Sequence, residues 1–421
     1  MTRAPGPKGR LIGGSLERFK ADPLACLMDA AQDHGDIVRL RFGPFIAHLV
    51  NRPDLVDHVL SRNSANYDKA TRSADRIAAT TGNSLLSANG AAWQRHRSLI
   101  QPAFQPRCFD GIGPVIDRLL DPMMARWDGA GSIDIVDEMM QLVLGCAIRI
   151  LFSSAIDPQR INAALDVLLV DTWRRIEAPV DAAMLSRRLH RPAFRRAVAE
   201  IDSIVLDLIR TRRAQIHRPD DVLSRLLHAH ETDGAVHLSD RELRDAAVTL
   251  LLAGHETTAN ALSWAFIHAA GRWEASDPAH LFAEAIRLYP SIWVIERRAI
   301  ADDTIGGYHI PRGSSVLISP YLLHRKPDLW SDPDRFDPTR FAGGHTPARH
   351  SYLPFGLGAH RCVGLHLARG IARHVLGRVL GRFHLHLLPG QSLDTLPGLT
   401  LHHKGAVRMI ITRKRLSDGG A

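Results

Sequence analysis

The chain has 421 residues, of which 45% are hydrophobic, so it is long enough to bury a large core. Its net charge of +9 comes from 53 Lys and Arg against 44 Asp and Glu, and the arginines are spread along the whole chain. A diffuse excess of this kind is more typical of a solvated surface than of a nucleic-acid-binding stripe, so we expect no nucleic-acid partner.

The cysteines and the N-terminal segment indicate a protein of a reducing compartment. Cys26, Cys108, Cys146 and Cys362 lie far apart, without the density of a disulfide scaffold and without a CxxC pair. No apolar run follows the basic residues at the N-terminus, and no window of about 18 uninterrupted apolar residues occurs elsewhere. The sequence therefore predicts a complete, cytoplasmic protein with no membrane span.

The predicted elements begin with a hairpin and continue mainly as helices. Apolar and polar residues alternate over 37–49 around Gly43 and Pro44, which predicts two strands joined by a tight turn. Apolar residues at three- and four-residue spacing then predict helices over 53–61, 91–100, 114–127, 134–152, 195–213 and 240–270.

The C-terminal part of the chain has a different texture. Short β-like runs, prolines and turn dipeptides occupy 293–355, followed by a helix over 363–380 and a strand-rich C-terminus. Neither a repeat nor a long linker interrupts the pattern. We therefore expect a mainly α fold with small β-sheets, forming one domain over residues 1–421.

A glycine-rich loop around Cys362 carries the strongest chemical signal. Residues 355–364 read FGLGAHRCVG and end where an amphipathic helix begins. At a helix N-terminus the dipole and the unpaired backbone N–H groups stabilise a thiolate, and a thiolate binds iron. The glycines allow close approach to a flat cofactor, the phenylalanine can shield the sulfur, and the histidine can reach a cofactor carboxylate. The predicted cofactor contacts in this loop are Phe355, Gly356, His360, Cys362 and Gly364.

An isolated cysteine at a loop–helix junction is usually just a small buried apolar residue, but the residues around Cys362 argue against that interpretation. The segment resembles the cysteine-ligand loop of the cytochrome P450 family, in which a thiolate ligates haem iron. The resemblance runs from the predicted hairpin to the C-terminus and indicates a bacterial, soluble haem-thiolate monooxygenase. It implies haem b as the cofactor, Cys362 as the axial ligand of the iron, and dioxygen as the co-substrate.

A polar patch interrupts the apolar helix predicted over 240–270. Burying polar groups is costly unless they are used, and a glycine and threonines there can loosen the helix to open a groove for dioxygen. Because splitting dioxygen consumes protons, a carboxylate that leads to water and a hydroxyl that holds a water suit the chemistry. The resemblance implies these catalytic roles for Glu256 and Thr257, and cofactor contacts for Ala253 and Gly254.

Two other interpretations of this patch are open to test. The segment HETTA begins like a zinc-peptidase motif, but the second histidine of that motif would stand where Ala259 is. The other alternative is that Glu256 and Thr257 only satisfy one another inside a core helix.

Three charged residues resemble the network that braces the cysteine loop in cytochrome P450 proteins. Glu284 and Arg287 are three residues apart on one helix face, which by itself is a common surface pair of little value. The resemblance implies that Arg340, in the segment PTRF, joins them in a buried structural network. We assign these residues to structure and not to catalysis.

Further cofactor contacts are predicted at two distant places. Trp93 and Arg97 are four residues apart, share a helix face and are placed to reach a haem propionate. Arg297 resembles another propionate-binding arginine of the family. Because adjacent strand residues face opposite ways, only Arg297 or its neighbour Arg298 should point at the cofactor.

The chain departs from the family in one place and lacks a reductase of its own. Thr257 and Glu284 are only 27 residues apart, which leaves little room for the helix that normally intervenes. No dinucleotide fingerprint and no second large domain follow the cysteine loop, so electrons must come from another protein or from a peroxide. We expect a ferredoxin-type donor with its reductase. Arg349, Arg361, Arg369 and Arg373 are its candidate docking face, or else ordinary solvated charges.

The substrate is expected above the cofactor, against apolar residues of the polar-patch helix and of the segment after the Glu284 helix. The predicted pocket residues are Leu251, Leu252, Ala253, Ile292 and Val294. Their character favours a lipophilic small molecule such as a terpenoid, fatty acyl or polyketide-like compound. The alternatives to a monooxygenase are a peroxide-driven peroxygenase or oxidative coupling enzyme, and a non-catalytic haem sensor.

Overall fold

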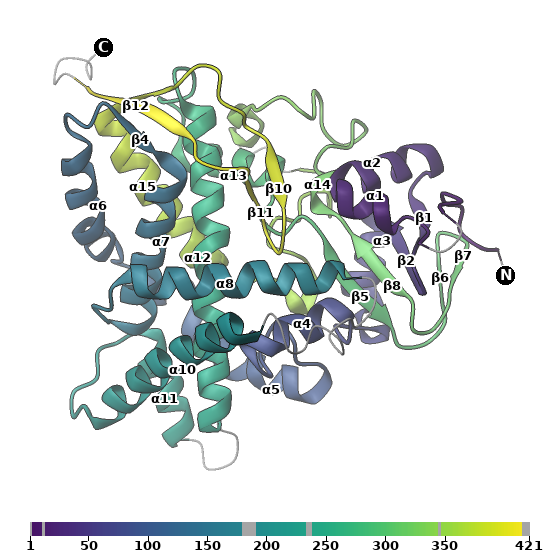
Figure 1. Ribbon diagram of the computed structural model, residues 1–421, viewed down its shortest axis with the longest axis horizontal. Helices are drawn as coiled ribbons and strands as arrows, with labels where there is room; N and C mark the ends of the chain where they lie inside the picture. The colour runs from purple at the N-terminus through teal and green to yellow at the C-terminus, as the bar shows by residue number, and fades with distance from the viewer. Residues whose placement is uncertain (1, 11–12, 179–190, 233–237, 344–346, 415–421) are drawn as a thin grey trace.

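The structure is a computed structural model that describes residues 2–10, 13–178, 191–232, 238–343 and 347–414. Helices fill one side and the centre of the molecule, and a five-stranded sheet with its flanking helices lies on the other side (Figure 1). Among the helices of these described ranges, none combines the length and the apolarity that a bilayer crossing requires. The expected mainly α fold with small sheets is confirmed.

The helices of the described ranges have these bounds: α1 (Leu16–Ala21), α2 (Pro23–His34), α3 (Pro53–Asp57), α4 (Arg72–Thr81), α5 (Gly90–Ile100), α6 (Gly113–Trp127), α7 (Ile135–Phe152), α8 (Pro158–Glu177), α10 (Arg191–Ala214), α11 (Val222–Thr232), α12 (Asp240–Ala269), α13 (Pro278–Leu288), α14 (Pro320–Leu323) and α15 (Leu365–Arg382). The strands are β1 (Ile37–Phe42), β2 (Phe45–Val50), β3 (Tyr67–Asp68), β4 (Ser132–Asp134), β5 (Ile295–Ala299), β6 (Asp303–Ile305), β7 (Tyr308–Ile310), β8 (Ser315–Ile318), β9 (Phe383–Leu387), β10 (Thr395–Pro397), β11 (Leu401–His403) and β12 (Arg408–Arg413).

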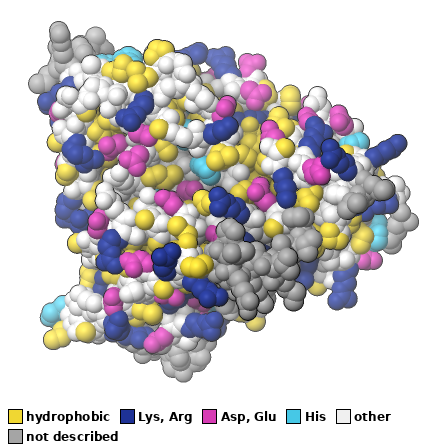
Figure 2. Space-filling view, in the orientation of Figure 1, with side chains coloured by type: hydrophobic (Ala, Val, Ile, Leu, Met, Phe, Trp, Pro, Cys, Tyr) yellow, Lys and Arg dark blue, Asp and Glu magenta, His cyan; other side chains and the backbone are white. Residues whose placement is uncertain are grey.

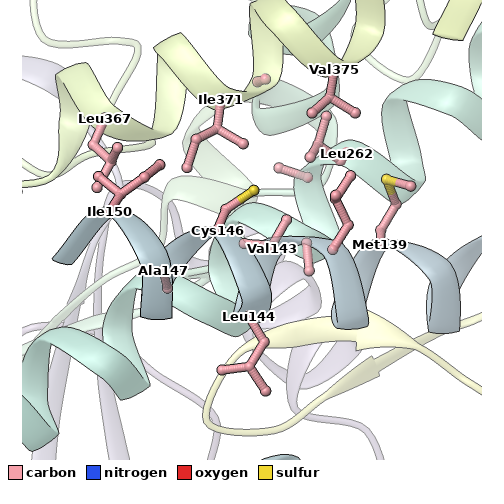
Figure 3. Packing of buried hydrophobic residues seen from close by; sticks show 14 of the residues in the cluster. Met139, Val143, Leu144, Cys146, Ala147, Ile150, Leu262, Leu367, Ile371 and Val375 are labelled. Carbon is pink, nitrogen blue, oxygen red and sulfur yellow. The ribbon is translucent and has the colours of Figure 1, made fainter. Parts of the chain in front are cut away.

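The long helix α12 runs through the centre of the helical body, with α7 and α15 near it (Figure 1). Its first turn is held by a capping box in which Ser239 and Glu242 satisfy each other's backbone N–H groups. Buried apolar side chains of the three helices pack together, among them Val143 of α7, Leu262 of α12 and Ile371 of α15 (Figure 3). Each large side chain buried in this way contributes about 1.5–3 kcal/mol. The packing makes α12 a rigid platform for the polar patch.

The N-terminal sheet has the strand order β1-β2-β8-β5-β3. The predicted hairpin is confirmed, since β1 and β2 pair antiparallel with Phe42 opposite Phe45 across the turn. Gly43 has φ +61 in that turn, a conformation that glycine adopts without strain. The second strand pairs parallel with β8, which brings a segment some 270 residues away in sequence onto the hairpin.

Most of the predicted helices occur within a few residues of their expected bounds, but one prediction was partly wrong. The helix expected over 53–61 is α-helical only over Pro53–Asp57 and continues as a π-helix over His58–Arg62. Helices α1, α2, α4, α8, α11 and α14 were not predicted. The sequence did contain a helix start signal for α8, namely Asp157 as a capping residue. In the structure its side chain accepts the backbone N–H of Gln159.

The shortened segment between α12 and α13 is confirmed. The first helix ends at Ala269 and the second begins at Pro278, and residues 270–276 form only turns and a bend. The Asp277 side chain caps the second helix by accepting the backbone N–H of Ala279. The chain therefore passes directly from one helix to the next.

Candidate active site

Cys362 lies in the loop that leads into α15, where its backbone N–H donates to the Phe355 carbonyl at 2.9 Å. The residue as a whole is exposed, whereas Cys26 and Cys146 are buried, but protein atoms lie close enough around its thiol to desolvate it. Desolvation by the surrounding protein raises the pKa of the Cys362 thiol, while backbone N–H groups of Gly364 and Leu365 pull it down. These N–H groups belong to the start of α15 and are hydrogen-bond donors that stabilise the thiolate form of Cys362.

Glycines give the loop its path. Gly356 and Gly358 have φ +71 and +69, and a Cβ at Gly358 would overlap the carbonyl oxygen of Leu60. No atom lies within 4 Å of a Cβ placed at Gly356. Gly358 is therefore required by close backbone packing as well as by its dihedral angle.

This difference predicts unequal losses for two alanine substitutions. Gly356→Ala should lower the free energy of unfolding by about 1–2 kcal/mol through left-handed strain alone. Gly358→Ala should lower it by roughly 3 kcal/mol, because overlap with Leu60 adds to the strain. Urea unfolding of both variants measures the difference, and equal losses would show that the Leu60 contact has no importance.

The structure brings together the three residues predicted to brace this loop. The Glu284 carboxylate accepts two hydrogen bonds from Arg287, at 2.7 and 2.8 Å, and lies 3.3 Å from Arg340 Nε. Glu284 and Arg287 are completely buried. The remaining donors of Arg287 reach the carbonyls of His324, Pro333 and Arg335, so its charge is fully satisfied by protein groups.

His324 connects this network to the cysteine loop and was not found from the sequence. Its Nδ1 lies 2.9 Å from the Arg287 carbonyl, and its Nε2 accepts the backbone N–H of Leu353 at 2.8 Å. Complete burial lowers the pKa of His324 to about 3, so the ring is neutral and one nitrogen can accept. The Tyr352 hydroxyl also donates to the Ala283 carbonyl at 2.8 Å. Two contacts therefore tie the start of the loop to α13.

The residues predicted to reach a propionate lie around His360. The Trp93 and His360 rings are 3.9 Å apart between centroids, and Arg97 donates to the Arg361 carbonyl at 2.7 Å. Arg298 is held by the Asp68 carboxylate at 2.7 Å. Arg297 Nη1 donates to the Glu296 carbonyl at 2.8 Å, and the positive charge of Arg297 helps to lower the pKa of His360. The two neighbouring arginines thus face different surroundings, as alternation along a strand requires.

Lys69 completes a group of four basic side chains with Arg97, Arg297 and His360, here called the cation cluster, in which the His360 ring is neutral near pH 7. Burial and the nearby Arg297 and Arg97 lower the pKa of Lys69 to about 7. Burial, Arg297, Lys69 and Arg97 lower the pKa of His360 to about 3, and burial lowers that of Arg297 to about 10. Within the described ranges, none of the four forms an ion pair with a carboxylate. A cluster of this kind fits a group with two carboxylates, such as the propionates of haem.

Lys69 was missed because nothing in its sequence environment marks it. It follows the two-residue strand β3, and its ammonium donates to the Leu85 carbonyl while lying 5.6 Å from the Trp93 ring centroid. A buried lysine is uncommon unless it is paired, but the burial of Lys69 is evident only from the tertiary structure. The tertiary structure therefore adds one cation to the predicted set.

The polar patch on α12 lies in an unbroken helix. The expected loosening of the hydrogen-bond ladder does not occur, because the Thr257 hydroxyl donates to the Ala253 carbonyl at 2.8 Å and the helix continues through both residues. Such a bond to the preceding turn satisfies a threonine without breaking the helix. No atom lies within 4 Å of a Cβ placed at Gly254, so space remains beside the helix at that position.

Glu256 faces a cavity of about 260 Å³ that opens between α7, α8 and the turn before β12. Burial is the main reason why the pKa of Glu256 rises to about 7, with the negative charge of Asp166 acting in the same direction. Its Oε2 atom has no hydrogen-bond partner among the described residues. Asp166 and Asp137, both exposed, line the same cavity nearer to solvent. The carboxyl therefore faces a polar path to the surface.

The residues predicted to line the substrate pocket differ in how far they are buried. Leu251 is buried in the main core and Leu252 packs against it, whereas Ala253 and Val294 are partly exposed and Ile292 is 41% exposed. The Ser291 hydroxyl donates to the Thr257 carbonyl at 2.8 Å, which brings the 291–294 segment against α12. The segment predicted to contact substrate thus lies beside the predicted catalytic threonine.

Comparison with known proteins agrees with these features. The sequence profile described as Cytochrome P450 matches residues 4–276 and 280–407, and the break between them lies at the start of α13, directly after the shortened segment. Cyclooctatin synthase of Streptomyces melanosporofaciens is 32% identical over 97% of this chain and 95% of its own length. Pentalenene oxygenase of Streptomyces avermitilis is 29% identical over 92% of each chain.

A solved structure shows the same fold. The cytochrome P450DA heme domain superposes with a TM-score of 0.85 over 99% of this chain and 98% of its own, at 21% sequence identity. Together with the profile match, this accounts for the central helix, the small sheets and the loop around Cys362. The chain belongs to the cytochrome P450 family and is a haem-dependent monooxygenase.

Proposed function

We propose that the whole chain forms one domain, in which Cys362 ligates the iron of haem b and the cation cluster holds the propionates. The observation that carries this proposal is the cation cluster beside the cysteine loop, whose members have no carboxylate partner among the described residues and whose arginines lower the pKa of Lys69 and of His360. The bound haem supplies the oxidising chemistry with dioxygen. The protein residues position the cofactor, hold the substrate and supply protons.

Glu256 is proposed to supply protons to the oxygen-binding side, with Thr257 holding the water that receives them. A carboxyl with a pKa of about 7 releases and recovers a proton easily near neutral pH. Its unpartnered Oε2 and the cavity lined by Asp166 give it a path to solvent. Thr257 donates to the Ala253 carbonyl and keeps its oxygen free to accept a hydrogen bond from a water.

The coupling of oxygen consumption to product formation is expected to fall as pH rises through about 7. Between one pH unit below and one above that pKa, Glu256 changes from roughly 90% to roughly 10% protonated. Product per oxygen and released peroxide, measured from pH 6 to 8, should show this inflection. Glu256→Gln should turn over slowly and show no inflection of coupling with pH. Thr257→Ala should release more peroxide but should still show the inflection. An inflection that persists in Glu256→Gln would assign the titration to another group.

The substrate is proposed to be a lipophilic, unsaturated hydrocarbon or its alcohol. Relatives similar in sequence include pentalenene oxygenase and cyclooctat-9-en-7-ol 5-monooxygenase, whose names denote an alkene and an unsaturated alcohol. Ala253 and Val294 offer apolar contacts beside Thr257. Burial of apolar surface would supply most of the affinity for such a molecule.

Electrons are proposed to come from a ferredoxin-type protein with its reductase. Arg349, Arg361, Arg369 and Arg373 are all exposed, and Arg361 directly precedes Cys362. An acidic carrier would be steered to these charges, which lie on or next to the cysteine loop and α15.

The function is tested by screening alkenes and alcohols for the absorption change that marks displacement of water from ferric haem. Hits are then assayed for oxygen consumption and product with reduced ferredoxin, and separately with hydrogen peroxide. Hydroxylated product with ferredoxin supports the proposal. Turnover with peroxide alone would instead select the peroxygenase alternative.

A further inference from the structure

A second cavity, of about 540 Å³, lies at the N-terminal sheet and shares no lining residue with the site around Cys362. Its walls come from the N-terminal segment, the β1–β2 hairpin, β7 and the turn before β8. These elements lie together on the right of Figure 1, and the same end of the molecule carries many Lys and Arg side chains in Figure 2. Cavities of roughly 300–1,000 Å³ are the size that binds small organic ligands.

The residues that line this cavity include three arginines and two histidines but no carboxylate. Arg39 and His48 are directly opposite each other on β1 and β2, and Arg3 and Arg312 approach from the two flanking segments. Burial and the nearby Arg3 and Arg41 lower the pKa of Arg39. The cavity therefore concentrates positive charge without an anion of its own to balance it.

Two carboxylates outside the lining contact residues of the cavity wall, and the first, Glu296, accepts the Ser315 hydroxyl at 2.8 Å. The second, Asp302, accepts the backbone N–H of Arg312 at 2.7 Å and lies 3.3 Å from His309 Nε2. Within the described ranges, neither Arg3 nor Arg39 forms an ion pair. The positive charge of Arg3 acts unfavourably on Arg39, so an anion that binds between these two side chains stabilises both.

His48 provides a second, independent sign of a missing ligand. The residue is 1% exposed, and its Nδ1 has no hydrogen-bond partner among the described residues. Burial, followed by Arg39, His309 and Arg3, lowers the pKa of His48 to about 4. An unpartnered buried nitrogen is costly, and an acidic oxygen in the cavity would satisfy it.

We propose that this cavity binds an organic phosphomonoester, with the phosphate on Arg3, Arg39 and Arg312. A phosphate carries a charge of nearly −2 at neutral pH and three acceptor oxygens, which matches several guanidinium groups better than a single carboxylate does. The cavity also exposes Pro44, Phe45 and Pro311, which supply apolar contacts for the organic part of the ligand.

Occupation of the cavity would tie the N-terminal segment to the sheet. That segment already lies along β1 and β7. The Pro5 carbonyl accepts the backbone N–H of Arg39 at 2.7 Å, and the Thr2 carbonyl accepts the backbone N–H of His309 at 2.9 Å. A ligand that contacts Arg3 and Arg39 together adds a further link between the same elements. Because it binds only the folded chain, it raises the melting temperature.

The proposal is tested by calorimetric titration of the haem-loaded full chain at constant ionic strength, with phenyl phosphate, inorganic phosphate and benzoate as probes. Phenyl phosphate is expected to bind at least fivefold more tightly than inorganic phosphate and than benzoate, and to raise the melting temperature. Arg39→Gln and Arg312→Gln should each weaken it tenfold or more. Arg107→Gln, which removes an exposed arginine elsewhere, is the matched control and should leave it unchanged.

Several results would overturn the proposal. These are no phenyl phosphate binding at millimolar concentration, equal binding of benzoate, or unchanged affinity in Arg312→Gln, whose exposed position makes misfolding a poor explanation. A haem absorption shift on adding phenyl phosphate would place it at the haem and also count against a separate site. Because binding is measured without turnover, the outcome does not depend on the proposed oxygenase function.

Discussion

Cys362→Ser is expected to remove monooxygenase activity and the absorption signature of a thiolate-ligated, reduced carbon-monoxide complex. A serine hydroxyl does not ionise where a thiol does, so the backbone N–H groups of Gly364 and Leu365 have no thiolate to stabilise. The loop itself should persist, because the hydrogen bond from the residue 362 backbone to the Phe355 carbonyl does not involve the side chain.

Cys108→Ser is the matched control for this substitution. Cys108 is partly buried, and its Sγ donates to the Pro102 carbonyl at 3.5 Å, a bond that a serine hydroxyl can replace. Its spectrum and activity should match those of the unaltered chain. An unchanged carbon-monoxide spectrum in Cys362→Ser would refute the assignment of the axial ligand.

Arg287→Leu is expected to cause a large loss of stability. It leaves the Glu284 carboxylate buried without its main partner and three carbonyl groups without a donor. Breaking a buried pair in this way costs about 3–5 kcal/mol. The substitution also removes the hydrogen bond from the Arg287 side chain to the His324 carbonyl, and His324 holds the backbone N–H of Leu353 before the cysteine loop, so haem retention should weaken as well.

Denaturant unfolding and the haem-to-protein absorbance ratio measure these two effects. Arg378→Leu is the control, because Arg378 is partly exposed and pairs with Asp117 and Asp121 on the surface. Such pairs contribute about 0–1 kcal/mol. A loss in Arg287→Leu no larger than in the control would show that the buried network does not support the loop.

The helical body and the hairpin were predictable because their signals are local. Helix α7 shows apolar spacing over its whole length and begins after Asp134, whose side chain accepts the N–H groups of Val136 and Asp137. Shorter or more polar helices such as α4 were missed. The amphipathic pattern of α4 spans only ten residues, and a helix of this length is stable only because it packs against α8 and α12.

The assignment of individual charges depended on the fold. The sequence favoured Arg297 through the family resemblance and left Arg298 as its alternative, and the structure adds that Asp68 holds Arg298 because β3 pairs with β5. The sequence also predicted a loosened helix around Thr257, while the structure satisfies the threonine by a bond to the preceding turn. Pairing of distant segments is invisible to a pattern that extends over a few neighbouring residues.

The sequence by itself determined the family and singled out the loop around Cys362 and the pair Glu256 and Thr257, because motifs depend on residue type and spacing within one segment. Only the tertiary structure revealed Lys69 in the cation cluster, His324 between α13 and the loop, and the basic cavity beside His48. Each of these combines side chains from segments far apart in the chain. Their charge and burial arise only when folding removes water from between those segments.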